Sequence, residues 1–224
     1  MQIIYWSDYA CPFCYIGERV LKQAFTNLHT NENLNLIMKS FELDPAASKK
    51  VTSTTPERFA IKYGLTQERA LARINSISEM GRSAGINFNY ASTRYTNTLD
   101  AHRLTKLAQS KEDKSIAEKL SENLYSAYFT ENLELANPDV LINAGVSAGL
   151  DESEIKNLLE SNKYESEVRQ DEQEAHKTGI HSVPFFVIEN KYYISGAQSL
   201  ETMTETLRRG LDINNNFSCG AEGC

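Results

Sequence analysis

Two cysteines separated by two residues, Cys11 and Cys14, are the part of this sequence best suited to chemistry. They follow a short apolar run at residues 3–6 and precede a segment whose apolar residues recur at helical spacing. The sequence therefore places the pair where a strand ends and a helix begins. Unpaired backbone N–H groups and the positive end of a helix dipole favour a thiolate on Cys11 at that position. Because the thiolate is the form that attacks disulfides, the pattern predicts thiol–disulfide exchange.

The same spacing is also half of a zinc site, because structural zinc ions are commonly held by Cys-x-x-Cys pairs. Further ligands would have to come from Cys219 and Cys224 or from the histidines, which are His29, His102, His176 and His181. No second tight Cys-x-x-Cys or His-x-x-x-His spacing is present in the sequence. A purely structural role fits poorly with Pro12 between the cysteines at a strand–helix junction. We therefore favour redox chemistry over metal binding and expect no metal site.

Composition sets the class of protein. The 224 residues are 41% hydrophobic and 24% charged, which is ordinary for a globular protein of one or two domains. The net charge of −7 argues against nonspecific nucleic-acid binding. No apolar run is long enough to span a bilayer, and no signal-peptide pattern follows Met1, so we expect a cytoplasmic protein with no membrane partner. Cysteines in that compartment are more often catalytic or metal-binding than structural.

The hydrophobic pattern predicts the order of the elements. A strand at 2–6, a helix at 14–28 and a strand at 34–43 come first. A stretch from 56 to 179 then reads as almost wholly helical. Strands return as a hairpin at 185–188 and 191–194, and a last helix is expected over 199–209.

This order predicts an α/β protein with a thioredoxin-like fold and a large all-helical domain inserted between strand 2 and the strand after Pro184. We assign residues 1–50 and 180–212 to the thioredoxin-like domain and 51–179 to the helical insertion. Residues 213–224 are polar and contain glycine, so we expect a flexible tail that carries Cys219 and Cys224.

Several stretches, in chain order, resemble the FrnE-type branch of the DsbA family of thiol–disulfide oxidoreductases. They are residues 11–17, 41–45, 97–104, 127–129, 179–187 and 195–198, and together they span nearly the whole chain. The resemblance implies a disulfide oxidoreductase or isomerase with Cys11 as nucleophile and Cys14 as resolving thiol. It also implies a cis Val183–Pro184 bond opposite the cysteines. The backbone of Val183 and Pro184 would then bind a substrate peptide by strand addition.

One position departs from the periplasmic DsbA pattern, which has histidine before the second cysteine where this chain has Phe13. Without that cation we expect a pair less oxidising than the DsbA value of about −120 mV. We expect an apolar rim around the cysteines, formed by Phe13, Tyr9, Tyr15 and Phe185.

Two further polar residues are candidates near the site. His102 lies in the family-like 98–104 segment, so we include it with Phe13 and Tyr9 as a substrate-binding candidate; the alternative is an ordinary packed or surface histidine. Asp8, three residues before Cys11, is either a residue that tunes the cysteine or a common turn residue.

Two other function classes stay open. Kappa-class glutathione transferases and hydroxychromene-carboxylate isomerases share the inserted-helix architecture and resemble this chain at 97–104. They usually carry serine at the first active-site position, and serine cannot form a disulfide. The presence of both Cys11 and Cys14 therefore favours redox chemistry. The remaining alternative is a non-catalytic thiol module that binds metal or holds unfolded clients.

The expected partners are disulfide- or dithiol-containing proteins or small thiols, together with a cellular reductase. No bound organic cofactor is expected, although glutathione is a candidate redox partner. We interpret Cys219 and Cys224 as an accessory redox pair that exchanges with Cys11 and Cys14, because FrnE-type proteins can carry a C-terminal pair. Idle tail thiols and metal capture are the alternatives. The sequence carries no prediction of the oligomeric state.

Overall fold

The computed structural model describes residues 1–211. Residues 212–224, which include Cys219 and Cys224, lie outside the described residues. The predictions of a flexible tail and of an accessory redox pair therefore stay predictions.

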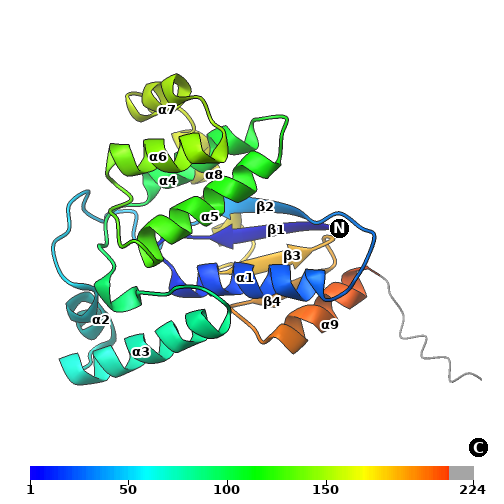
Figure 1. Cartoon of the computed structure of the whole chain (residues 1–224), viewed down its shortest axis with the longest axis horizontal. Coiled ribbons are helices and arrows are strands. Elements are labelled where there is room, and N and C mark those ends of the chain that lie inside the picture. Colours follow the sequence, from blue (N-terminus) through cyan, green and yellow to red (C-terminus); the bar gives the residue numbers. More distant parts are fainter. Residues whose placement is uncertain (212–224) are drawn as a thin grey trace, which may run out of the picture.

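A four-stranded sheet with the order β2-β1-β3-β4 forms the centre of the fold (Figure 1). The strands are β1 (Gln2–Ser7), β2 (Asn35–Ser40), β3 (Phe185–Ile188) and β4 (Tyr192–Ser195). β1 pairs with β2 in parallel and with β3 antiparallel, and β3 pairs antiparallel with β4. The predicted hairpin is confirmed, while the second strand is shorter than the predicted 34–43.

Helix α1 (Pro12–Thr26) follows β1 and begins and ends two residues earlier than predicted. Cys11 is its N-cap residue, with extended backbone angles, and Pro12 occupies the first helical position. Proline suits that position because its fixed φ is helical and its missing N–H would have had no partner. The helix buries an apolar face and packs against α9 (Leu200–Gly210), which is capped by Ser199.

The helical insertion runs between β2 and β3 in the described chain. Its helices are α2 (Thr55–Tyr63), α3 (Gln67–Ser83), α4 (Leu99–Gln109), α5 (Ser115–Phe129), α6 (Pro138–Ala148), α7 (Glu152–Leu159) and α8 (Glu165–Lys177). Residues 84–98 are the main departure from the predicted helical stretch, since they contain only the 3-10 turn η1 (Tyr90–Ser92). Figure 1 shows α2 and α3 at the end of the sheet where β1 leads into α1, with the other insertion helices on the β2 side.

One cluster of buried residues joins the sheet, α1 and the insertion. At its centre the ring of Tyr15 on α1 stacks on Tyr125 of α5, with centroids 4.8 Å apart. Phe88 and Phe129 stack beside them at 4.7 Å. These aromatic contacts fix the helix that carries the cysteines against the insertion, since buried aromatic side chains contribute large apolar areas. No helix among residues 1–211 is long and apolar enough to cross a membrane.

Candidate active site

The two cysteines lie at the start of α1, as the sequence predicts, and both are free thiols. The Cys11 N–H donates to the Asp8 carbonyl at 3.1 Å, and the Cys14 N–H donates to the Cys11 carbonyl at the same distance. Cys11 is 4% exposed and lines a cleft, whereas Cys14 is 1% exposed and is absent from the cleft lining. The first cysteine therefore faces the place where a substrate would arrive, and the second lies behind it.

The loop before β3 lies against this pair. The Val183–Pro184 peptide bond is cis. The thiol of Cys11 donates to the Val183 carbonyl oxygen, with sulfur and oxygen 3.7 Å apart. A Cβ atom on Gly17 would lie only 3.1 Å from Pro184 Cγ, so this glycine lets α1 approach the loop closely. The structure thus brings together Cys11, Val183 and Pro184.

Burial controls the protonation of Cys14. Desolvation is the largest cause that raises the pKa of Cys14 well above its usual range, and the neighbouring Cys11 raises it further. A weaker opposing contribution comes from the Ser7 hydroxyl. Cys14 is therefore a neutral thiol at pH 7 and must lose a proton before it can act as a nucleophile.

Asp8 joins the loop that leads to Cys11 to the loop that follows β2. Its carboxylate accepts the Ala10 N–H at 3.2 Å and the Leu43 N–H at 2.8 Å. His102 Nε2 lies 3.5 Å from Asp8 Oδ1, although neither ring nitrogen of His102 makes a hydrogen bond of good geometry. Burial by itself would raise the pKa of Asp8, but His102 and the two backbone donors outweigh it and lower the pKa. Asp8 is thus an ionised carboxylate that positions the loop leading to Cys11.

Two of the predicted substrate-binding residues do not reach the cleft. Tyr9 and His102 are fully buried, so the prediction that they contact substrate directly is wrong for this structure. The Tyr9 hydroxyl is bonded to Thr105 at 2.6 Å, and its ring packs on His102 with centroids 5.3 Å apart. The physical reason is the helical insertion. Its helices α4 and α5 cover this end of β1, so Tyr9 and His102 lie in the core and not at the rim of the cleft.

The remaining rim residues divide in the same way. Tyr15 is buried in the aromatic stack, so it too is not a rim residue. Phe185 is half-buried and packs between Trp6 and Tyr193. Phe13 is 37% exposed and lines the cleft together with Cys11, as predicted.

Helices α2 and α3 supply the opposite wall of the cleft, which encloses about 490 Å³. The side chains of this wall include two arginines, a lysine, two aromatic rings and an isoleucine, namely Arg58, Arg73, Lys62, Phe59, Tyr63 and Ile77. Sequence reasoning missed all of them. Their spacing is that of ordinary amphipathic helices, and only the packing of α2 and α3 beside the start of α1 brings them to the cysteines.

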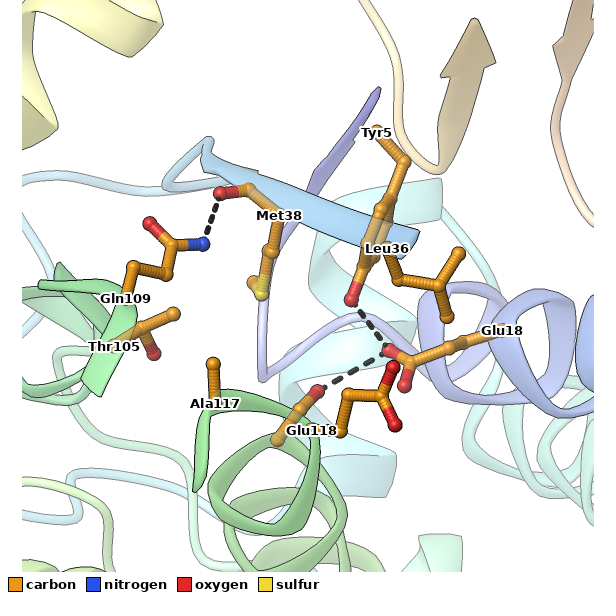
Figure 2. Close-up of a pocket in the computed structure, with 9 residues that line it drawn as sticks. Tyr5, Glu18, Leu36, Met38, Thr105, Gln109, Ala117 and Glu118 are labelled. Atoms are coloured by element: carbon orange, nitrogen blue, oxygen red, sulfur yellow. Dashed lines mark hydrogen bonds between the residues drawn. The ribbon is translucent and has the colours of Figure 1, made fainter. Parts of the chain in front are cut away.

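A buried carboxylate one helical turn beyond Cys14 is a second feature that the sequence did not reveal (Figure 2). Glu18 accepts hydrogen bonds from the Tyr5 hydroxyl at 2.9 Å and from Ser121 at 3.2 Å. Its other oxygen accepts from Lys22 at 2.7 Å. Burial, followed by the charge of Glu18, raises the pKa of Tyr5 well above its usual range, so this tyrosine stays a donor. The network links α1, β1 and α5 beneath the cysteines.

Among residues 1–211, no group of three or more His, Cys, Asp or Glu side chains is arranged so that it could hold a metal ion.

A Cys-x-x-Cys pair at a strand–helix junction, opposite the proline loop of a mixed sheet, defines a thioredoxin-like protein. The sequence model of the DSBA-like thioredoxin domain matches residues 2–208. The chain therefore belongs to this family.

Similar proteins agree with that assignment. A crystal structure of a probable DsbA oxidoreductase from Streptomyces coelicolor shares 31% identity and a TM-score of 0.87, covering 100% of this chain and 98% of that one. The uncharacterized protein YwbO of Bacillus subtilis is 25% identical over 193 residues, which cover 84% of this chain and 86% of YwbO. A 2-hydroxychromene-2-carboxylate isomerase shares 14% identity and a TM-score of 0.66, with 95% and 99% of the two chains covered. That last likeness shows a common fold alone.

Proposed function

We propose that this protein is a thiol–disulfide oxidoreductase that uses Cys11 and Cys14 as its redox pair, and that it belongs to the FrnE-type branch of its family. The observation that carries the proposal is the division between the two thiols: Cys11 lines the cleft and bonds to the Val183 carbonyl, while Cys14 lies buried behind it. This is the arrangement needed for one sulfur to meet substrate and the other to resolve the product.

The reaction proceeds in two exchanges. The Cys11 thiolate attacks one sulfur of a substrate R–S–S–R′, the substrate S–S bond breaks, and R′–S⁻ leaves and takes up a proton. Cys14 then loses its proton and attacks Cys11 Sγ, which releases R–S⁻ and leaves a Cys11–Cys14 disulfide. Two electrons have passed from the enzyme to the substrate. The reverse sequence oxidises a dithiol.

The backbone around Val183 positions the substrate in this scheme. A bound substrate would take over the Val183 carbonyl that now accepts the Cys11 thiol, and the exposed ring of Phe13 would contact it across the cleft. The chemistry requires no bound organic cofactor. The oxidised Cys11–Cys14 pair is reduced again by small thiols, by glutathione or by a cellular reductase. We place the reaction in the cytoplasm.

Two variants test the function. Cys11→Ser should abolish reduction of a disulfide such as oxidised insulin, because no nucleophile remains at the cleft. Cys14→Ser should accumulate a mixed disulfide on Cys11 that mass spectrometry detects, because the resolving thiol is gone. A Cys11→Ser protein that reduces insulin at the wild-type rate contradicts the proposal.

The same proteins test the transferase and isomerase alternative. Glutathione conjugation of an electrophile is measured beside insulin reduction in the wild type and in Cys14→Ser. A conjugation activity that survives the loss of Cys14, with no insulin reduction by the wild type, would replace the proposed function with glutathione-dependent chemistry.

A further inference from the structure

The charge of the cleft beside Cys11 is opposite to that of the whole chain. The protein carries 30 acidic and 23 basic residues, for a net charge of −7. The lining of the cleft nevertheless contains Arg58, Lys62 and Arg73 and no Asp or Glu. Negative ligands are therefore attracted to this place on a protein that otherwise repels them.

These cations are not neutralised by neighbouring carboxylates. Elsewhere on the protein, arginines pair with acids, as Arg94 does with Glu134. Within residues 1–211, Arg58, Lys62 and Arg73 form no ion pair with a carboxylate, and the Lys62 ammonium lies 5.8 Å from the centroid of the Tyr63 ring.

Arg58 is the most constrained of the three. Its guanidinium carbon lies 3.5 Å from the centroid of the Tyr95 ring, which fixes the orientation of the group. Its Nε atom is buried and has no hydrogen-bond partner within residues 1–211. A buried N–H without an acceptor costs free energy, so the hydrogen-bonding capacity of this guanidinium is not fully used inside the protein. Arginine is also the side chain whose planar donors best match a carboxylate.

The size of the cleft indicates the kind of ligand. A volume of about 490 Å³ falls within the range of roughly 300–1,000 Å³ that is usual for small-molecule sites. The rings of Phe13, Phe59 and Tyr63 line the same cleft, so the site combines apolar surface with positive charge.

We propose that the cleft selects low-molecular-weight disulfides that carry carboxylate groups near the scissile sulfurs, with Arg58, Lys62 and Arg73 as the specificity-determining residues. This inference rests on the proposed function, because it assumes that Cys11 attacks the disulfide. An anionic thiolate and an anionic disulfide repel each other in water. The three cations offset that repulsion in the cleft. The carboxylates of the disulfide slow its reaction with a thiolate in water, whereas in the cleft they speed its reaction with Cys11.

A charge series of small disulfides tests the inference with the full, pre-reduced chain. The probes are 3,3′-dithiodipropionate with two carboxylates, 2-hydroxyethyl disulfide with no charge, and cystamine with two ammonium groups. Acid quenching and peptide mass spectrometry report the rate at which the Cys11–Cys14 disulfide forms. Each rate is divided by the rate of the same probe with free dithiothreitol, which removes the intrinsic reactivity of the disulfide.

The normalised rates should fall in the order anionic, neutral, cationic. Lys62→Gln and Arg73→Gln should each lower the anionic-to-neutral ratio about two- to fivefold at low salt, which is the size of an exposed charge interaction. Arg58→Gln should lower it at least as much, and circular dichroism melting shows whether that variant is folded. The control is Arg69→Gln, an exposed arginine of α3 that does not line the cleft, which should leave the ratio unchanged.

The possible failures are distinguishable. If the neutral probe oxidises Cys11 and Cys14 much faster than it oxidises dithiothreitol but the charge order is absent, the inference is overturned and the proposed function stands. An effect of Arg69→Gln equal to that of Arg73→Gln also overturns it, because overall charge rather than the cleft would then set the rate. If no probe oxidises the pair, the proposed function itself is wrong.

Discussion

The thiol of Cys11 lies 3.7 Å from the carbonyl oxygen of Val183 and donates to it. These residues are 172 positions apart in the chain, and the whole helical insertion lies between them. The contact places the outer cysteine against the backbone of the proline loop and leaves Cys14 enclosed. The proposed chemistry depends on this difference between the two sulfurs.

The first prediction concerns which thiol reacts. With limiting iodoacetamide at pH 7, the reduced protein should be alkylated at Cys11 well before Cys14. Cys11 lines the cleft, whereas burial raises the pKa of Cys14 and keeps it protonated. Peptide mass spectrometry gives the order of labelling, and preferential labelling of Cys14 would refute the assignment of nucleophile and resolving thiol.

Asp8 should make stability depend on pH in the acid range. Because the folded protein lowers the pKa of Asp8 below its ordinary value of 3.8, the unfolded state binds the proton more readily. The stabilising contribution is therefore fully present above pH 3.8 and is lost as the pH falls through the lower, folded pKa. The difference in unfolding free energy between the wild type and Asp8→Asn, measured by urea melts, should shrink as the pH falls below 4. A difference that does not change down to pH 2.5 would contradict this account.

Replacing Glu18 should destabilise the fold, because its carboxylate accepts from Tyr5, Ser121 and Lys22 inside the protein. Glu18→Gln leaves an amide N–H₂ facing these donors, which should cost about 1–3 kcal/mol. Glu118, which lies beside the same small cavity in Figure 2 and is exposed, supplies the matched control. In urea melts, the free energy of unfolding of Glu118→Gln should be close to that of the wild type. Equal free energies of unfolding for Glu18→Gln and Glu118→Gln would mean that the Glu18 network contributes nothing to stability.

The accessory role of Cys219 and Cys224 is a prediction from the sequence alone, since both lie outside the described residues. Replacing both with serine should leave the melting temperature unchanged and slow turnover with a protein substrate. Unchanged turnover together with lost zinc binding would favour metal capture instead.

The parts of the fold and site that the sequence predicted are those governed by local rules. The strand–helix junction at the cysteines and the hairpin in 185–195 both form as predicted, although α1 begins and ends two residues earlier than expected. The position of Pro184 opposite Cys11 came from the family resemblance, since no local pattern links residues so far apart.

The errors come from packing between distant elements. Tyr9, two residues before Cys11, is predicted to lie at the rim, but α4 and α5 bury it. Arg58 and Arg73 carried no signal, because an amphipathic helix presents cations wherever it meets solvent. The sequence carried no prediction for Glu18, whose burial depends on the contact between α1 and Ser121 of α5.

The most direct test of the central claim is the equilibrium of Cys11 and Cys14 with glutathione redox buffers, followed by alkylation and mass spectrometry of the active-site peptide. The account predicts a reversible two-electron couple between these two cysteines, with a reduction potential more negative than about −120 mV because Phe13 supplies no cation beside the thiolate. A pair that forms no Cys11–Cys14 disulfide in any buffer, including one of oxidised glutathione alone, would contradict it.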